Sequence, residues 1–479
     1  MRKMMYGFML FVIMVHSGVN AQDHFGTLSR INDILYLVQG NYVSEDKVQY
    51  QLLTDGALRG MLEKLDPYTL YFPENEFKEF NNDIDGVYEG VGMEIDKRGE
   101  YIVVVSPFEG SPAEKAGVKP GDKIIEVNGE SAIGWQHVDI TKKLRGKSGT
   151  SVTIAVLREG HSSKIVIPLV RAEIRSKSVT LSYMITPEIG YIRFSQFQQQ
   201  SPEEMRDALS GLSNTGMKKV IVDLRGNPGG ILSVAHAIAD LFIDDGIIVT
   251  TKGRNPDANE TYPATKNTPF KNIPLVLLVD EGSASASEIF AGAVKDLKRG
   301  TLIGAKTYGK GSVQRIFPLS DNSGVKMTIA LYYTPSGVCV DKNGITPDIV
   351  IDKKLFPAQI DLIRNENWFL KFAAAHSKNY SLNTDGSVHP SPFDAFVDYL
   401  HHEKADMPSL LLSDPVLREA FLGLTDWESR IMNAMRHDIE DVLTYGIIEY
   451  RKGEKEARKA LLSRDEVVRA AIRVLNEQK

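Results

Sequence analysis

Cysteine and histidine are scarce in this sequence, which has one cysteine and ten histidines among its 479 residues. A single cysteine excludes an internal disulfide, so packing must stabilise the fold even in an oxidising compartment. Cys339 could be a catalytic thiol, but no histidine lies near it in the sequence. We therefore favour a structural interpretation, in which Cys339 is a small residue at the end of a strand. Between residues 189 and 351 the only histidine is His236. It lies in the helical pattern LSVAHAIADLF, which favours a packed or surface residue over a catalytic base.

Concentrated positive charge and long apolar runs are also absent. The formal charge of −6 argues against nucleic acid as the main partner, because phosphate binding needs a concentrated basic face. Apolar residues at 42% and charged residues at 25% exclude a largely disordered or fibrous chain. No metal-ligand cluster is visible, so we expect no cofactor. The length exceeds that of one hydrophobic core and predicts at least three folded units.

The amino terminus has the pattern of a cleaved signal peptide. Residues 1–21 combine Arg2 and Lys3 with a short apolar run and a small-residue site ending at Ala21. We therefore expect an exported protein, most simply a periplasmic one, with secretion or membrane association as alternatives. A membrane anchor is less favoured, because the apolar run is shorter than the ~20 residues that span a bilayer.

Hydrophobic periodicity divides the remaining chain into four parts. A helical pattern is followed by short β-rich runs with glycine and proline, then by alternating strand and helix patterns, then by a charged helical region. The alternation in the third part is typical of βαβ units. The predicted fold class is thus multidomain α/β, with boundaries at 22–85, 86–174, 175–352 and 353–479.

The segment IPLVLLVDEGSASASEIFAGAVKDL predicts a buried strand, a tight turn and a helix. A serine at such a turn can be exposed beside the unpaired N–H groups of the helix amino terminus. Ser283, Ser285 and Ser287 are all eligible as nucleophiles. A structural interpretation is also strong, because Ser285 followed by Glu288 forms a capping box.

With histidine poorly placed, lysine is the remaining candidate for a general base. A buried lysine can lose its proton and accept one from a serine hydroxyl. Lys310 lies between Gly309 and Gly311 in TYGKGSVQ, and Gln314 could orient its amine. Lys306 is a weaker competitor, and a solvated loop lysine is the structural alternative.

The segment VIVDLRGNPGG predicts a strand that runs into a glycine-rich turn before the next helix. Such a turn can present backbone N–H groups to an anion. Neither phosphate-binding glycine motif, G-x-x-x-x-G-K-[ST] or G-x-G-x-x-G, is present here, which favours an oxyanion hole over a nucleotide phosphate.

These three motifs in this order closely resemble those of the carboxyl-terminal processing peptidases, or tail-specific proteases. The segments GSPAEKAGVKPGDKIIEVNGES and LRGKSGT resemble the PDZ domain of these enzymes, and LDPYTLYF resembles their amino-terminal helical segment. The resemblance covers roughly residues 52–351. It implies a PDZ domain over 86–174, a peptidase core over 175–352 and a helical carboxyl-terminal extension of unknown role.

The resemblance also implies a role for each motif residue. The nucleophile would be Ser285, the general base Lys310 and the residue steadying the lysine Gln314. The oxyanion hole would combine the amide of Ala286 with a glycine amide of the NPGG turn, from Gly229 or Gly230. The alternative is an inactive PDZ scaffold with a hydrolase-like core, but such a chain would have lost Ser285 or Lys310.

For the PDZ domain, the resemblance assigns carboxylate binding to the EGVGM loop, with Gly90, Val91, Gly92 and Met93 supplying N–H groups. Peptides bind such domains by adding a strand, while an apolar groove reads their last side chains. Arg145 matches a basic position through which the PDZ domain of this family senses or couples substrate, and a solvated surface arginine is the alternative interpretation. The expected partners are proteins or peptides with apolar free carboxyl termini, and the extension could serve a homo-oligomer or an adaptor.

Overall fold

The computed structural model describes residues 21–477, except 85, 99, 109, 120, 159–162, 267, 352–358, 361–362, 364–367, 384–386 and 413–425. The predicted signal peptide therefore lies, apart from its last residue, outside the described residues. The chain forms two compact units. The first contains Met1–Phe77 and Gln314–Thr328, and the second contains Lys78–Val313 and Ile329–Lys479.

The first unit is mainly helical. It contains α1 (Ala21–Asn41), a 3₁₀ turn (Glu45–Lys47), α2 (Tyr50–Leu62), β1 (Leu70–Phe72) and the start of α3 (Glu74–Ile84). Strand β1 pairs antiparallel with the first residues of β18 (Gly324–Tyr333). Among the described helices of the chain, none is both long and apolar enough to cross a membrane.

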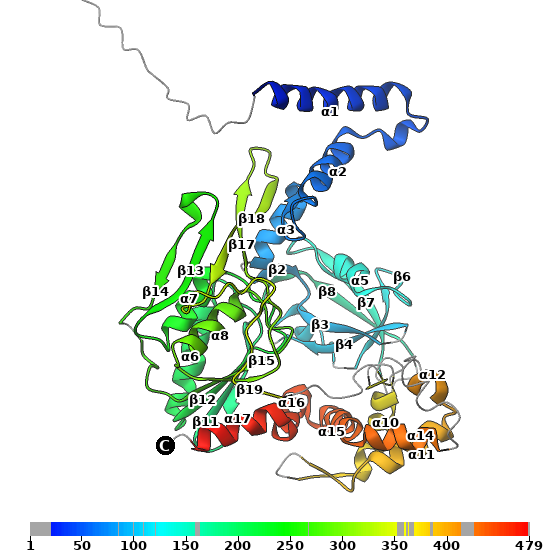
Figure 1. Cartoon of the computed structure of the whole chain (residues 1–479). Coiled ribbons are helices and arrows are strands. Elements are labelled where there is room, and N and C mark those ends of the chain that lie inside the picture. The colour runs from blue at the N-terminus through cyan, green and yellow to red at the C-terminus, as the bar shows by residue number, and fades with distance from the viewer. Residues whose placement is uncertain are drawn as a thin grey trace, which may run out of the picture. The chain divides into compact units, whose positions relative to one another are not determined.

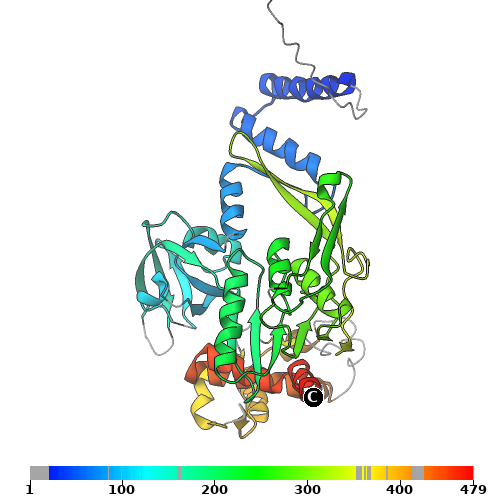
Figure 2. The ribbon, with the colours of Figure 1, turned by 90° about the vertical axis from the view of Figure 1, so that its left-hand side faces the viewer.

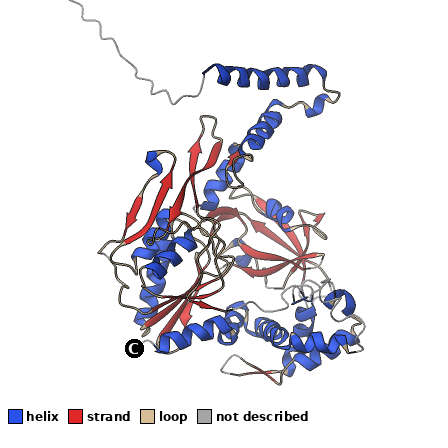
Figure 3. Ribbon diagram, in the orientation of Figure 1, coloured by secondary structure: helices blue, strands red, loops and turns tan. Residues whose placement is uncertain are grey.

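In the second unit the β-rich module forms an antiparallel sheet in the order β3-β4-β5-β7-β8, with β6 paired to β5. Strands are red and helices blue in Figure 3. Its elements are β3 (Met93–Arg98), β4 (Tyr101–Pro107), α4 (Pro112–Lys115), β5 (Lys123–Val127), β6 (Glu130–Ser131), α5 (His137–Leu144), β7 (Ser151–Leu157) and β8 (Ile165–Val170). Strands β2 (Val87–Gly90) and β9 (Ala172–Arg175) pair at the two ends of the module. Ile140 of α5 is fully buried against Ile124 and Ile154 of the sheet, which fixes the helix on it.

The following region is an α/β domain whose sheet has the order β10-β11-β12-β15-β16-β19. All neighbouring strands are parallel except the edge pair β10–β11. The strands are β10 (Val179–Met184), β11 (Ile189–Phe194), β12 (Lys219–Asp223), β15 (Leu275–Val279), β16 (Thr301–Gly304) and β19 (Ile349–Val350). The helices of this region are α6 (Ser201–Asn214), α7 (Leu232–Asp240) and α8 (Ala286–Asp296). Strands β13 (Ile247–Gly253) and β14 (Thr261–Pro263) pair with each other and are not part of this sheet.

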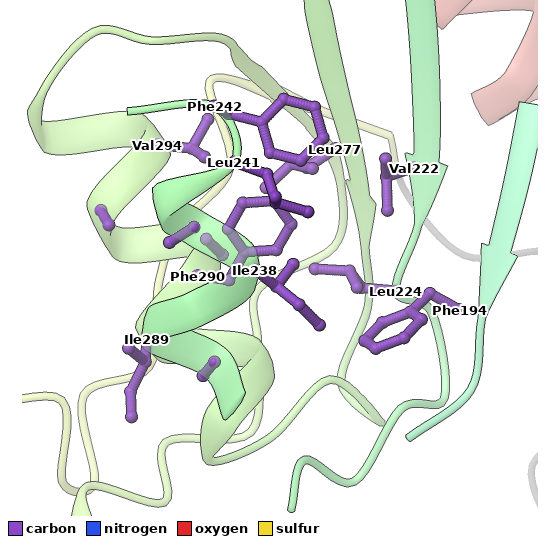
Figure 4. Packing of buried hydrophobic residues seen from close by; sticks show 14 of the residues in the cluster. Phe194, Val222, Leu224, Ile238, Leu241, Phe242, Leu277, Ile289, Phe290 and Val294 are labelled. Carbon is purple, nitrogen blue, oxygen red and sulfur yellow. The ribbon is translucent and has the colours of Figure 1, made fainter. Parts of the chain in front are cut away.

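Both faces of this sheet are buried, as the continuous apolar runs of its strands require. Val222 and Leu277 of the sheet share one hydrophobic core with Ile238 of α7 and Phe290 of α8, and Figure 4 shows these side chains between the strands and the two helices. The alternate residues of the same strands, including Ile221, point to the opposite face, which α17 (Glu466–Glu477) covers. The region is therefore a three-layer α/β domain.

The carboxyl-terminal region is helical, as expected, and is coloured yellow to red in Figures 1 and 2. Its elements are α10 (Trp368–His376), a 3₁₀ turn (Ser377–Asn379), β20 (Ser381–Leu382), β21 (Val388–His389), α11 (Phe393–His402), α12 (Met407–Leu411), α14 (Trp427–Ala434), α15 (Arg436–Lys452) and α16 (Glu454–Arg464). These helices share a hydrophobic core of their own. In contrast, α17 belongs to the core of the α/β domain, a placement that the sequence pattern did not indicate.

Candidate active site

Two turns at the carboxyl ends of β12 and β15 are joined by hydrogen bonds. We call residues 224–230 the glycine-rich turn and residues 280–287 the serine turn. The Ser283 Oγ donates to the Leu224 carbonyl oxygen at 2.8 Å, and the Gly226 N–H donates to Asp280 Oδ1 at 2.7 Å. The Asn227 carbonyl oxygen accepts the Ala284 N–H at 3.0 Å. Neighbouring parallel strands thus bring both turns to one edge of the sheet, where open α/β sheets bind ligands.

Within the serine turn, the three candidate serines differ in exposure. Ser283 and Ser287 are fully buried, and each hydroxyl donates to a backbone carbonyl of the glycine-rich turn: Ser283 to Leu224 and Ser287 to Asn227. Ser285 is only half-buried and has the backbone angles φ 56° and ψ −115°. A positive φ strains a serine and is typical of functional turns. The structure therefore presents Ser285 and uses the other two serines to fix the turn.

A buried carboxylate links the serine turn to the loop that contains Lys310. Glu288 is fully buried, and its Oε2 accepts the N–H groups of Ser285 at 2.8 Å and of Lys310 at 2.9 Å. Its Oε1 accepts the Thr307 hydroxyl at 2.6 Å and the Gly309 N–H at 2.7 Å. Because one oxygen accepts both amides, the Ser285 and Lys310 backbones lie within two hydrogen-bond lengths of each other.

Tyr332 of β18 forms a second link between the same two residues. Its single hydroxyl proton is shared between the carbonyl oxygens of Ser285 at 3.0 Å and Lys310 at 2.6 Å. Burial, together with the neighbouring Glu288, raises the pKa of Tyr332 well above its usual value, so the hydroxyl remains a donor.

Lys310 is half-buried, whereas the competing Lys306 is exposed. The glycines beside Lys310 permit a close backbone approach: a Cβ added at Gly311 would lie 2.1 Å from the Asp341 nitrogen. Gly309 has φ 90°, which a larger residue would adopt only with strain. The loop around Lys310 is thus held by packing and is not a solvated tip.

The two glycines that the sequence left as alternatives have different surroundings. The Gly229 N–H donates to Asn227 Oδ1 at 2.9 Å, and the residue is buried. Gly230 is exposed, and no acceptor for its N–H or for that of Ala286 is found among the described residues. A Cβ added at Gly229 would lie 2.8 Å from the Ala286 nitrogen. Gly229 therefore keeps the space in front of Ala286 open, while Gly230 and Ala286 have N–H groups available to an anion.

The start of the glycine-rich turn is held by a buried ionic network. The Asp223 carboxylate accepts the Tyr191 hydroxyl at 2.6 Å and donors of Arg193 and Arg225 at 2.7 Å. Burial alone would raise the pKa of Asp223, but the two guanidinium groups outweigh it and lower the pKa to about 2. The carboxylate is therefore ionised at neutral pH.

The β-rich module contains a groove between β3 and α5, with a volume of about 220 Å³. Residues 90–93 line one side, and His137, Thr141 and Leu144 of α5 line the other. No acceptor for the Val91 or Gly92 N–H is found in the described part of the chain. Arg145 also lines the groove, with its guanidinium 5.1 Å from the centre of the Tyr88 ring.

Comparison with known proteins identifies the two domains. The model of peptidase family S41 matches residues 188–351, and the PDZ domain model matches residues 84–157. The carboxy-terminal-processing protease of Bartonella bacilliformis is 37% identical over 342 residues, which cover 70% of this chain and 77% of the relative. The chain belongs to peptidase family S41. It is thus a serine-type peptidase with a PDZ domain, and the predicted family and multidomain α/β fold class are confirmed.

Further relatives of this S41 peptidase include the probable CtpA-like serine protease of Staphylococcus aureus, 36% identical over 364 residues, which cover 75% of this chain and 71% of the relative. Among solved structures, the photosystem II D1 C-terminal processing protease is 30% identical, with a TM-score of 0.42, and the match covers 68% of this chain and 93% of that chain. The PDZ domain of the carboxy-terminal protease from Vibrio cholerae, solved in complex with peptide, is 31% identical, with a TM-score of 0.18, and covers 19% of this chain and 99% of that one.

The remaining sequence candidates of the S41 peptidase are placed as follows. Gln314 belongs to the first unit, where its Nε2 donates to Thr328 Oγ1 at 3.4 Å. His236 has its Nε2 2.8 Å from the Pro263 carbonyl oxygen and packs on the Tyr262 ring. Cys339 forms an isolated β-bridge with Tyr333. No group of three or more possible metal ligands occurs among the described residues.

Sequence reasoning missed several residues that hold the S41 site together. Glu288 was interpreted only as a helix cap, whereas it also binds the Lys310 loop. Tyr332 lies in a strand pattern without any chemical signal. Asp223 and Arg225 are within the DLRGNPGG motif, so the motif could have indicated them. The second partner of Arg225, Asp465, lies 240 residues further along the chain.

Proposed function

We propose that this S41 peptidase recognises the free carboxyl-terminal tail of protein substrates through its PDZ domain and cleaves them through an acyl-enzyme. Ser285 attacks the scissile carbonyl carbon, and the Lys310 amine takes the hydroxyl proton. The resulting ammonium then protonates the leaving amine. Water, deprotonated by the same lysine, then attacks the acyl carbon, and the lysine returns this proton to Ser285 Oγ as the bond between Oγ and the acyl carbon breaks.

The observation that carries this proposal is the shared hydrogen bonding of Ser285 and Lys310. Their backbone N–H groups donate to one oxygen of buried Glu288, and their carbonyl oxygens share the single hydroxyl proton of Tyr332. A nucleophile and its base must stay within reach of one another through every turnover. A buried link that is hydrogen-bonded to both residues in this way supports the roles of Ser285 as nucleophile and Lys310 as base.

For the oxyanion hole we favour Gly230 over Gly229 as the partner of Ala286. The Gly229 N–H is already donated to Asn227, whereas Gly230 is exposed and its amide has no acceptor among the described residues. Ala286 is the first residue of α8, so its N–H also receives the positive end of the helix dipole. Gln314 as the residue that steadies the lysine stays a prediction from the family resemblance.

Recognition of the substrate tail is supported by the groove of the PDZ domain. Residues 90–93 line one side of it, and the Val91 and Gly92 amides are available to a terminal carboxylate. Apolar Leu144 on the opposite wall suits an apolar final side chain. Coupling through Arg145 is part of the proposal, because this residue lines the groove and contacts Tyr88.

We also propose that the protein is exported, most simply to the periplasm, on the basis of residues 1–21. Sequencing the amino terminus of the mature protein tests this: a chain that begins after residue 21 supports export. An intact Met1 contradicts cleavage.

The proposed chemistry is tested by replacing serines in the same turn. A peptide with a free apolar carboxyl terminus serves as substrate, and we expect Ser285→Ala to abolish its cleavage. Ser287→Ala is the matched control; it loses a buried hydrogen bond, worth about 1 kcal/mol of stability, but keeps the nucleophile. Lys310→Arg should be inactive because a guanidinium stays protonated. An active Ser285→Ala variant, or full activity of Lys310→Arg, would contradict the mechanism.

A further inference from the structure

The last helix, α17, is part of the peptidase domain although it lies outside the residues that the S41 family model matches. Its buried Val468, Ala471 and Leu475 pack on the sheet face opposite α7 and α8. The sheet residues that they meet are Leu181, Ile189, Tyr191, Ile221, Val276, Leu278 and Ile303. The helix thus completes the third layer of the domain (Figures 1 and 2).

An ionic path leads from the beginning of α17 to the glycine-rich turn. Asp465 Oδ1 accepts the N–H groups of Val467 at 2.8 Å and Val468 at 3.1 Å, so it caps the helix. Its Oδ2 accepts Arg225 Nη1 at 2.7 Å. The other guanidinium nitrogens of Arg225 donate to Asp223, the last residue of β12. Arg225 therefore bridges the helix and the strand that leads into the turn.

We propose that Asp465 is a positioning residue for peptide-bond hydrolysis, which holds Arg225 and thereby the glycine-rich turn that carries Gly230. This inference rests on the proposed function, because it assumes that the Gly230 amide stabilises the oxyanion. Two cations, Arg193 and Arg225, face two carboxylates, Asp223 and Asp465, so the charges are balanced.

Loss of the Asp465 charge would leave two guanidinium groups facing one carboxylate. Arg225 is one-fifth exposed, so its pairing is only partly screened by water. Without its second anchor, the guanidinium is held by Asp223 alone, through Nε and Nη2. Asp223 Oδ1 also accepts the Arg225 backbone N–H at 3.0 Å, so a shift of this ion pair moves the backbone at 225. Gly226, the next residue, is tied to the serine turn through Asp280, so such a shift changes how the two turns face one another.

This displacement affects the transition state more than substrate binding. A backbone amide that stabilises an oxyanion acts only when negative charge develops. A misplaced Gly230 amide therefore lowers kcat and leaves KM nearly unchanged. A role of Asp465 in stability alone would lower the melting temperature without changing kcat of the folded enzyme.

The test uses the full-length enzyme with Asp465→Asn, Asp465→Glu and Asp441→Asn. Asparagine caps helices as well as aspartate, so Asp465→Asn removes the charge and preserves the cap. The matched control is Asp441→Asn, which breaks the ion pair of Asp441 with Arg464, the residue next to Asp465. We measure kcat and KM on a free-acid peptide and the melting temperature of each variant.

We expect kcat of Asp465→Asn to fall about tenfold with KM within a factor of two, since small misplacements of catalytic groups have effects of this size or larger. Asp465→Glu, which restores the charge, should recover part of the loss. Asp441→Asn should melt at a lower temperature with wild-type kcat. The proposal is overturned if Asp465→Asn has wild-type kcat, or if Asp465→Glu is no better than Asp465→Asn. An active Ser285→Ala variant would instead overturn the proposed function.

Discussion

Among single residues, two glycines of the second unit have nearly the same backbone angle φ but differ in how closely other atoms approach them. Gly229 has φ 98° and Gly216 has φ 99°. A Cβ at Gly229 would lie 2.6 Å from the Ala284 carbonyl oxygen and 2.8 Å from the Ala286 nitrogen, whereas at Gly216 the nearest atom, the Pro187 carbonyl oxygen, is 4.0 Å away. Replacing each glycine by alanine should introduce similar backbone strain, but only the change at Gly229 should also obstruct the site.

We expect Gly229→Ala to lose at least about 100-fold in kcat/KM, because its methyl group displaces the serine turn and covers the Ala286 amide. Gly216→Ala bears only the cost of a positive φ, about 1–2 kcal/mol, and should retain near-wild-type activity. Peptide cleavage and urea unfolding of both variants measure the two effects. Equal activity of the two variants would show that the Gly229 position does not shape the site.

The ionised side chain of Asp223 makes the stability of the fold depend on pH. Its pKa is lowered from 3.8 to about 2 because Arg225 and Arg193 outweigh the effect of burial. Because the pKa of Asp223 is lower in the folded than in the unfolded chain, its ionisation stabilises the fold fully at pH values above the unfolded-state pKa. This contribution is lost as the pH falls through about 2. The pH window is therefore roughly 4 to 2.

Asp223→Asn tests this window, since asparagine does not titrate. At pH 6 the variant should be less stable than the wild type, and the difference in unfolding free energy should shrink by about 2 kcal/mol between pH 6 and pH 2. Urea unfolding at several pH values measures this difference. A difference that stays constant or widens toward pH 2 would contradict an ionised, stabilising Asp223.

Among structural elements, residues 90–93 of the PDZ domain, which we propose to bind the substrate carboxylate, and the nearby Gly110 allow a second comparison of two glycines. Gly92 has φ 73° and Gly110 has φ 74°. A Cβ at Gly92 would lie 2.5 Å from the Ser111 Cβ, whereas nothing lies within 4 Å of a Cβ at Gly110.

We expect Gly92→Ala to weaken binding of a peptide with a free apolar carboxyl terminus by at least about tenfold, since the loop must move. Gly110→Ala should bind normally. Fluorescence anisotropy of a labelled peptide checks both, and equal affinities would argue against carboxylate binding by this loop.

Secondary structure around the site could be predicted because its signals are local. The apolar strand before Ser285, the small residues of the turn and the helix after it all follow each other in the sequence, and the structure has β15, the serine turn and α8 there. Our preference for Gly230 over Gly229 in the proposed oxyanion hole could not come from the sequence, because it depends on the hydrogen bond between the Gly229 N–H and the Asn227 side chain. The position of α17 was not predictable either: an amphipathic pattern shows that a helix has an apolar face, not which sheet it covers. Long-range partners such as Asp465 leave no local signal.

At the scale of the whole molecule, the proposed function requires that the PDZ domain and the peptidase domain act on one substrate. A free α-carboxylate is an anion that backbone amides near Val91 and Gly92 can bind, and an amide cap removes that charge. A tail ending in Asp-Asp carries additional charges, which are costly to bury in a groove with apolar walls.

We therefore expect the full-length enzyme to cleave a substrate ending in apolar residues much faster than its amidated form or a version ending in Asp-Asp. The three substrates share one cleavage sequence, so differences in rate report recognition of the tail alone. Gly92→Ala should lose the discrimination and cleave all three at similar rates, while Gly110→Ala should keep it. Cleavage is followed by mass spectrometry under conditions of limiting enzyme.

If the wild-type enzyme cleaves the three substrates at equal rates, tail recognition by this PDZ domain is refuted. That result would leave Ser285 and Lys310 as the proposed catalytic pair, because their contacts with Glu288 and Tyr332 do not involve the groove.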